Sequence, residues 1–148
     1  MAEQVSQQLR LMVASRAYHV CEYCLIHEDD TFWGCQVDHI ISRKHSGTSD
    51  PNNLAWACAV CNNRKGTDLG SLAGNPPLLV QFFNPRIDRW ADCFQLTGAR
   101  IEPLTERGSA TANLLQFNED TRLRERITLG LIGRYRYPTI EALARMKE

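Results

Sequence analysis

The spacing of hydrophobic residues predicts helices and short strands in the first half of the chain. Residues 3–17 carry apolar side chains three and four positions apart, which is typical of an amphipathic helix packed on a core. Residues 35–41 are rich in β-branched and apolar residues, and residues 54–57 form a second short run, so two strands are predicted. Gly, Pro, Asp and Asn make residues 45–53 a loop between them. A helix is predicted over about residues 62–70.

The second half of the chain alternates turn-forming and apolar residues. Residues 73–87 contain three prolines and predict an extended connector that Phe82 and Phe83 anchor to the core. A hairpin is predicted next, with strands over residues 90–96 and 100–102 joined by a turn at Thr97-Gly98. Three helical segments are predicted after the hairpin. The first spans residues 111–117, and the second is marked by Leu123, Ile127 and Leu131. The third begins at Pro138 and carries Ile140, Leu143 and Ala144.

Length and composition favour a globular protein. The chain has 148 residues, 43% of them hydrophobic, which suits a single domain over residues 1–148. We expect its core over about residues 16–70 and an extension over about residues 71–148. The sequence lacks an apolar run of about 18 residues and the basic and apolar start of a signal peptide. We therefore expect a soluble, cytoplasmic protein without a membrane partner. The sequence does not indicate its oligomeric state.

The charge of the chain is balanced overall and uneven locally. A formal net charge of zero excludes a protein that coats DNA through bulk charge. Near the C-terminus, Glu125 is the one acidic residue among several arginines. This segment is either a local contact for nucleic acid or an ordinary solvated helix face, and we favour the solvated face. The arginines are Arg122, Arg124, Arg126, Arg134 and Arg136.

Four of the six cysteines form two Cys-x-x-Cys pairs, Cys21 with Cys24 and Cys58 with Cys61. This spacing lets both sulfurs of a pair face one point, and thiolates select Zn²⁺ or an iron centre over Mg²⁺. Four thiolates leave no open coordination position, so we predict a structural Zn²⁺ that cross-links a segment poor in apolar residues. Two redox dithiols are the alternative, but neither pair fits the start of a helix in a βαβ unit. Cys35 stands apart and is predicted to be buried.

Between and beside these pairs stand Asp38-His39-Ile40, Asn53-Leu54 and Asn62-x-x-Lys65. Together with the cysteine pairs, this order resembles the HNH (ββα-metal) endonuclease family, in its zinc-containing subgroup of bacterial type, over about residues 16–68. The resemblance implies an α+β fold. Its core is of the ββα-metal type, treble-clef-like and stapled by zinc, with a helix before it and a hairpin plus helices at the C-terminus.

The resemblance also implies a catalytic set of four residues for phosphodiester hydrolysis. His39 matches the general base, and Asn53 matches the residue that holds the loop and orients that base. Asp38 and Asn62 match the ligands of a divalent cation. Many family members carry histidine at the position of Asn62. The amide oxygen of Asn62 is a harder ligand than imidazole, which favours Mg²⁺ or Mn²⁺. Lys65 is expected to contact a phosphate from the first turn of its helix.

These residues also have ordinary structural interpretations. Neighbours on a regular strand point to opposite faces, so Asp38 and His39 share one site only if a bulge or twist interrupts the strand. Taken singly, an Asp-His pair is often solvated, Asn62 is often a helix N-cap, and Lys65 is normally solvated. Further candidates for nucleic-acid contact follow the first strand: Arg43, Lys44 and His45. An exposed His45 without that role is equally compatible with the sequence.

Part of the second half resembles the tail of one bacterial HNH subgroup. The similar residues are Asn84-Pro85-Arg86, Trp90 and Phe94. Cys93 stands where that tail is expected to carry histidine, so any role of the histidine is missing here. We expect Trp90 and Phe94 to belong to the core rather than to stack on bases.

The sequence therefore predicts a metal-dependent HNH endonuclease that hydrolyses phosphodiester bonds of DNA. The resemblance implies products with 5′-phosphate and 3′-hydroxyl ends. The alternative is a non-catalytic treble-clef zinc module that binds nucleic acid or protein, which has no need for the whole catalytic set. A third hypothesis is a redox protein that uses the Cys-x-x-Cys pairs, which a bound zinc would exclude. Sequence specificity, nicking versus double-strand cleavage, and DNA versus RNA stay open.

Overall fold

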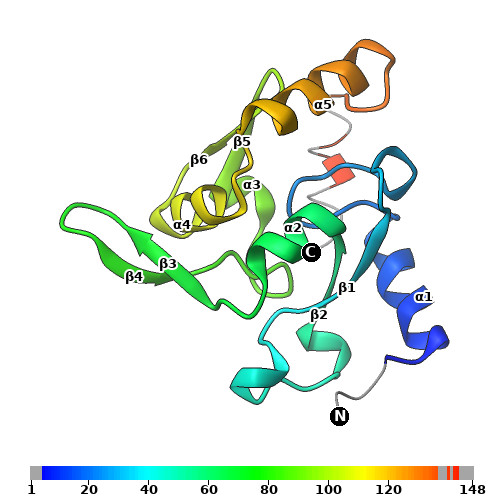
Figure 1. Ribbon diagram of the computed structural model, residues 1–148, viewed down its shortest axis with the longest axis vertical. Coiled ribbons are helices and arrows are strands. Elements are labelled where there is room, and N and C mark those ends of the chain that lie inside the picture. The colour runs from blue at the N-terminus through cyan, green and yellow to red at the C-terminus, as the bar shows by residue number, and fades with distance from the viewer. Residues whose placement is uncertain (1–4, 137–139, 141, 144–148) are drawn as a thin grey trace. The chain divides into compact units, whose positions relative to one another are not determined.

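The computed structural model describes residues 5–136, 140 and 142–143. The chain forms two compact units, one up to Leu69 and one from Gly70 onward, and each is described by itself (Figure 1). Among the described residues, no helix is long and apolar enough to cross a membrane. The single domain expected over residues 1–148 stays a prediction.

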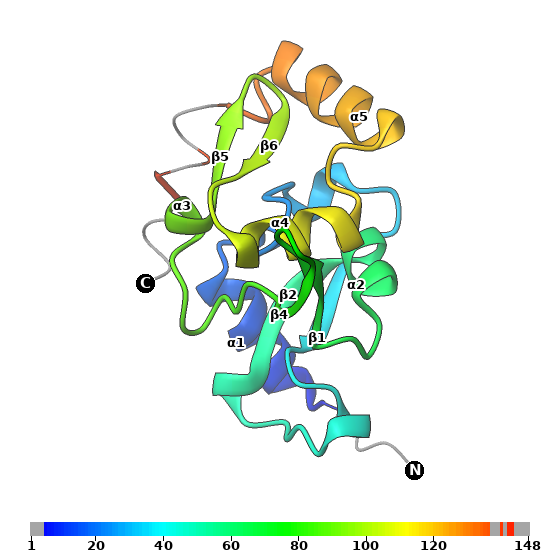
Figure 2. The ribbon, with the colours of Figure 1, turned by 90° about the vertical axis from the view of Figure 1, so that its left-hand side faces the viewer.

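The first unit is built on a two-stranded antiparallel hairpin that lies between two helices (Figures 1 and 2). The register runs without a break from the pair Cys35–Cys58 to the pair His39–Leu54. In chain order the elements are α1 (Gln7–Arg16), β1 (Cys35–His39), β2 (Leu54–Cys58) and α2 (Ala59–Lys65), with 3₁₀ turns at Glu28–Asp30, Arg43–His45 and Pro51–Asn53.

Helix α1 confirms the helix predicted near the N-terminus, but Met12, one of the residues of its predicted apolar face, is 37% exposed. The Ser6 side chain caps it by accepting a hydrogen bond from the Leu9 N–H. Val13 is fully buried and packs with Leu54 and Trp56 of β2, so the helix covers one face of the hairpin. Burial of such side chains is worth roughly 1.5–3 kcal/mol each. Cys35 is half-buried against this cluster, rather than fully buried as predicted.

Helix α2 begins earlier than predicted and ends earlier. It starts at Ala59, because the Cys58 sulfur accepts a hydrogen bond from the Cys61 N–H and so caps the first turn. Gly66 follows it with φ +52°, a conformation that favours glycine. Asn62 therefore lies inside the helix and is not its N-cap. Lys65 lies in the last turn, and the predicted first-turn position was wrong.

Over residues 70–136, the second unit contains two further hairpins and three helices. Helix α4 packs on both strands of the first hairpin and on β6 of the second. The Thr105 side chain caps α4, which begins before the predicted residue 111. Its elements are β3 (Gly70–Ala73), β4 (Leu78–Gln81), α3 (Trp90–Cys93), β5 (Phe94–Thr97), β6 (Arg100–Pro103), α4 (Glu106–Leu115) and α5 (Asp120–Leu131).

The extended connector predicted over residues 73–87 was wrong in its first part. Strands β3 and β4 pair there, and the prolines Pro76 and Pro77 lie in the turn between them, where no ladder hydrogen bond is lost. The predicted anchors Phe82 and Phe83 are buried, as expected. The last predicted helix, from Pro138 onward, falls largely outside the described residues.

An aromatic cluster forms the core of the second unit. The ring of Phe94 contacts those of Phe83, Trp90 and Phe117, with centroids 5.1–5.6 Å apart. Trp90 and Phe94 are both buried, which confirms that they belong to the core. The predicted hairpin is present as β5–β6. Its first strand is shorter than expected, because Trp90–Cys93 forms a turn of helix.

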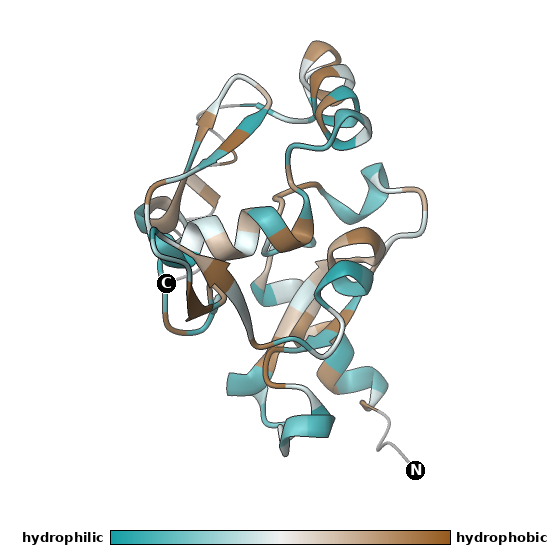
Figure 3. Cartoon of the chain, turned by 60° about the vertical axis from the view of Figure 1, so that its left-hand side comes forward, coloured by the Kyte–Doolittle hydropathy of each residue, from teal (hydrophilic) through white to brown (hydrophobic). Residues whose placement is uncertain are grey.

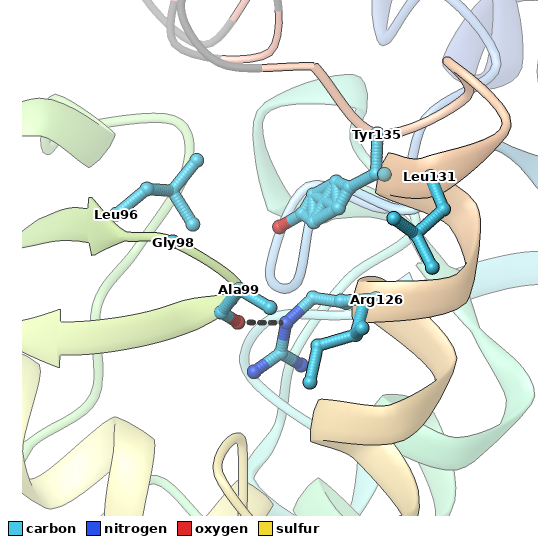
Figure 4. Close-up of a pocket in the computed structure, with 8 residues that line it drawn as sticks. Leu96, Gly98, Ala99, Arg126, Leu131 and Tyr135 are labelled. Carbon is cyan, nitrogen blue, oxygen red and sulfur yellow. Dashed lines mark hydrogen bonds between the residues drawn. The ribbon is translucent and has the colours of Figure 1, made fainter.

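Helix α5 reverses the predicted orientation of its side chains, which are mixed in hydropathy along its length (Figure 3). Leu131 is 84% exposed, whereas Arg122 and Arg126 are 3% and 1% exposed. The Arg126 guanidinium donates to the carbonyl oxygen of Ala99 at 2.7 Å (Figure 4), and it also donates to that of Phe117 at 2.7 Å. The solvated face predicted for these two arginines was therefore wrong, and so was contact of Arg126 with DNA.

We predict that Arg126→Met destabilises the second unit by about 3 kcal/mol, because two loop carbonyls lose a charged hydrogen-bond donor. Arg124, on the same helix, is exposed. Arg124→Met is the matched control and should change the free energy of unfolding by less than about 0.5 kcal/mol. Urea unfolding of the full chain measures both values. Equal stabilities of the two variants would contradict the buried role of Arg126.

Candidate active site

The four paired cysteines meet at one buried point of the first unit. The sulfur atoms of Cys21, Cys24, Cys58 and Cys61 all lie within 4.8 Å of one another, and all four residues are fully buried. The Cys24 and Cys58 sulfurs are 3.8 Å apart. Sulfurs bound at about 2.3 Å to one tetrahedral Zn²⁺ are also about 3.8 Å apart. The prediction of a four-cysteine metal site is confirmed, and its donor set fits Zn²⁺.

Each cysteine pair turns around its first sulfur. The Cys24 N–H points at the Cys21 sulfur, with the two atoms 3.5 Å apart, and the Cys61 N–H points at the Cys58 sulfur at 3.4 Å. Burial raises the pKa of Cys21 well above its usual range. Buried thiolates need a bound cation, because an uncompensated charge in the interior is costly. The cluster therefore has the chemistry of a closed, structural metal site.

The two residues between Cys21 and Cys24 connect this site to the hairpin. Glu22 exchanges hydrogen bonds with the backbone of Trp56, through its own N–H at 2.8 Å and through its carboxylate at 2.7 Å. The Tyr23 hydroxyl donates to Asp38 Oδ2 at 2.7 Å. The sequence gave only a weak indication of these contacts. Glu22 and Tyr23 are polar residues between two cysteines of a buried metal site, and this position brings both close to the interior.

Asp38 is a buried carboxylate on β1. Its second oxygen, Oδ1, accepts a hydrogen bond from Lys65 Nζ at 3.2 Å. Burial raises the pKa of Asp38, and the neighbouring Lys65 opposes that rise. A carboxylate has about four lone-pair sites, so each oxygen keeps acceptor capacity beyond the bond it already makes.

Lys65 is buried, and its ammonium lies at the end of β1. Beside Asp38, it donates to the backbone carbonyl of His39 at 3.1 Å. Its side chain is 2% exposed, so it is not the solvated lysine that the ordinary interpretation describes. Its expected contact with phosphate stays a prediction. In this structure the ion-pair partner of the Lys65 ammonium is the Asp38 carboxylate.

Asn62 lies three residues before Lys65 on α2 and is half-buried. Residues three apart share a helix face, and Lys65 on that face reaches Asp38. Asn62 therefore lies on the side of α2 that faces β1. A carboxylate and an amide on these facing elements are oxygen donors of the kind that Mg²⁺ and Mn²⁺ prefer.

His39 follows Asp38 at the end of β1 and is half-buried. Its Nε2 lies 3.0 Å from Ser49 Oγ, which also accepts from Arg43 Nη1 at 3.3 Å. Burial lowers the pKa of His39, and the nearby Arg43 lowers it further. The bulge suggested from the sequence is absent, because the strand register is regular through both Asp38 and His39. His39 is the last residue of β1, so a site shared with Asp38 requires a twist of the chain at the end of the strand and stays a prediction.

Asn53 holds the loop that follows β1. Its side chain accepts from the Ile41 N–H at 2.8 Å and donates to the Ile41 and Thr48 carbonyls at 2.9 and 2.8 Å. These bonds replace a strand partner, which explains why β1 ends before residue 41. Gly47 packs so closely on the loop backbone that a Cβ would lie 1.7 Å from the Ile41 oxygen.

This fixed loop presents a short cationic turn. Arg43, Lys44 and His45 form a 3₁₀ turn, and all three are exposed. Exposed basic side chains on such a turn are suited to contact with phosphates.

The family comparison agrees with this geometry. Residues 21–68 match the family model described as HNH endonuclease. This segment is an HNH domain. The chain matches no curated protein and no solved structure. The α+β fold with a four-cysteine core, predicted from the sequence, is confirmed by the HNH match and by the cysteine cluster.

Outside the HNH domain, the residues that resemble a bacterial tail have structural partners. Asn84 Oδ1 accepts from the Arg86 N–H at 2.9 Å, and Asp88 pairs with Arg107 at 2.8 Å. Cys93, at the position where histidine is expected, is buried, and that burial raises the pKa of its thiol. These contacts give the segment a structural explanation within its own unit.

Proposed function

We propose that the HNH domain hydrolyses phosphodiester bonds of DNA, with His39 as general base and a divalent cation, Mg²⁺ or Mn²⁺, on Asp38 and Asn62. One observation carries the proposal: burial and Arg43 lower the pKa of a half-buried histidine that stands next to a buried carboxylate. Such an imidazole is neutral near pH 7 and can accept a proton from water. A bound divalent cation supplies charge neutralisation at the phosphate and at the leaving oxygen.

In this proposal the other residues prepare the site. Asn53 fixes the loop so that the His39 ring keeps one orientation, and Ser49 holds its Nε2. His39 takes the proton of the attacking water, and Arg43, Lys44 and His45 bind phosphates nearby. Zn²⁺ on the four cysteines has only a structural role, because its coordination shell is closed.

The test of this function is cleavage of supercoiled plasmid by zinc-loaded protein in Mg²⁺, Mn²⁺, Ca²⁺ or EDTA, with end-group analysis of the products. We expect nicking in Mg²⁺ or Mn²⁺, loss of nicking in EDTA, and 5′-phosphate ends. Full activity in EDTA would contradict the divalent cation. Absence of cleavage in every metal, with binding retained, would favour the zinc binding module.

The cationic turn predicts a salt dependence of DNA binding. Replacing Arg43 and Lys44 together with Gln should reduce the slope of log K against log salt by about 1.8, or about 0.9 for each lost phosphate contact. Binding is measured in EDTA, so that cleavage does not interfere. Arg10→Gln is the control, because Arg10 lies over the Trp56 ring, 5.8 Å from its centroid. An unchanged slope in the double variant would exclude the turn from the interface.

A further inference from the structure

Asp38 is held by two side-chain donors, one neutral and one positively charged. The Tyr23 hydroxyl donates to Oδ2 at 2.7 Å, and Lys65 Nζ donates to Oδ1 at 3.2 Å. All three residues are buried, with exposures of 0%, 3% and 2% for Tyr23, Asp38 and Lys65. They come from the first cysteine pair, from β1 and from α2, so this carboxylate joins the three parts of the HNH domain.

The Tyr23 contact orients the carboxylate. A neutral hydroxyl on Oδ2 restricts rotation of the carboxylate and leaves its negative charge in place. Cys21 and Cys24 flank Tyr23 on both sides, so the metal site fixes the position of the phenol ring. A carboxylate held in one orientation loses less rotational freedom when it binds a cation, which increases affinity.

The Lys65 contact opposes the binding of a divalent cation to Asp38. Its ammonium occupies one acceptor site of Oδ1 and carries a positive charge a few ångströms from any cation on that oxygen. Two positive charges at that separation repel each other strongly in a buried environment. A cation that binds Asp38 must therefore displace Lys65 or bear this repulsion.

We propose that Tyr23 and Lys65 are positioning residues that set the divalent-cation affinity of Asp38 in opposite directions, Tyr23 raising it and Lys65 lowering it. The inference rests on the proposed function, since the cation is the one assigned to the nuclease site. A carboxylate weakened in this way holds Mg²⁺ or Mn²⁺ firmly only when phosphate oxygens complete the shell. Loading of the site is thereby coupled to the presence of nucleic acid.

The experiment is a Mn²⁺ titration, followed by electron paramagnetic resonance, of zinc-loaded full-length protein without nucleic acid. Tyr23→Phe should weaken Mn²⁺ binding about tenfold, the lower end of the loss expected when a metal ligand loses its orienting hydrogen-bond partner. Lys65→Met should strengthen binding by about the same factor. Tyr18→Phe, at a partly exposed tyrosine of the same unit, is the control and should not change it.

The opposite signs separate positioning from a merely structural role. Both substitutions remove a buried hydrogen bond, so a structural role would weaken Mn²⁺ binding in both variants or in neither. Either of those results overturns the inference. Zinc content and circular dichroism verify that each variant is folded. If Lys65→Met does not fold, Lys65→Arg decides: it keeps the charge and should bind Mn²⁺ within about twofold of wild type, and tenfold tighter binding overturns the inference.

Failure of this inference is distinguishable from failure of the proposed function. Wild-type protein that cleaves DNA, with unchanged Mn²⁺ affinity in both variants, removes the inference and leaves the nuclease. Wild-type protein that does not cleave DNA, with affinities that move in opposite directions, removes the nuclease reaction and supports the roles of Tyr23 and Lys65.

Discussion

Cys58→Ala is expected to abolish folding of the HNH domain and to release its metal. Cys58 is a buried member of the four-sulfur cluster and also caps α2 through its sulfur. Structural Zn²⁺ supplies about 10–16 kcal/mol in small zinc modules, which equals or exceeds the total stability of a typical domain, about 5–15 kcal/mol. The first unit also has a small core, so loss of the metal leaves little else to hold it together.

Metal analysis by mass spectrometry and circular dichroism of purified protein test this expectation. Cys35→Ala is the matched control, because Cys35 lies on β1 outside the cluster and is only half-buried. That variant should retain one zinc per chain and its helical signal. A Cys58→Ala protein that stays folded would contradict the structural role of the metal, as would a wild-type protein without zinc.

His39→Ala is expected to lower the cleavage rate by about 10²–10⁴-fold, the usual contribution of a general base. The substitution removes a half-buried ring whose described hydrogen bond goes to Ser49, so zinc content, fold and DNA binding should persist. His19→Gln is the control, since His19 is partly exposed and pairs with Glu28 away from the proposed site residues. A rate loss in His39→Ala accompanied by zinc loss would instead indicate unfolding.

The same residue predicts the pH dependence of cleavage. Only neutral imidazole accepts a proton, and burial together with Arg43 lowers the pKa of His39. The base form therefore persists below the ordinary histidine value of about 6.5, and the rate should decline only as the pH falls through the lowered pKa. Arg43→Gln should move this decline towards higher pH. A rate that is independent of pH over the acidic range would exclude His39 as the base.

The metal site was predictable because its geometry is local. Two residues between cysteines bring both sulfurs of a pair to one point, whatever the rest of the chain does. The HNH motif also identified which residues stand between the pairs. It did not reveal the start of α2, because the helix is capped by the Cys58 sulfur, an atom that the sequence assigns to metal binding.

The direction of the Lys65 side chain was not predictable. A lysine at the end of a short helix is normally solvated, and only the folded hairpin shows that a buried carboxylate on β1 lies within its reach. The partner Tyr23 stands far from Lys65 in sequence and belongs to a turn without a periodic pattern. Buried polar networks of this kind depend on tertiary contacts that neither composition nor spacing encodes.

Helix α5 shows where periodicity fails. Apolar residues four positions apart, Leu123, Ile127 and Leu131, indicated this helix, yet Ile127 and Leu131 are exposed. The loop carbonyls of Ala99 and Phe117 require donors, and Arg126 supplies them. The need to satisfy buried backbone groups thus outweighed the burial of two aliphatic side chains.

The most direct measurement of the central claim is the nicking of supercoiled plasmid by zinc-loaded wild type and His39→Ala, each first in EDTA and then after addition of excess Mn²⁺. The account predicts no nicking by either protein in EDTA, and a wild-type rate in Mn²⁺ that exceeds that of His39→Ala by about 10²–10⁴-fold. Equal rates for the two folded proteins, or wild-type nicking that EDTA leaves unchanged, would contradict it.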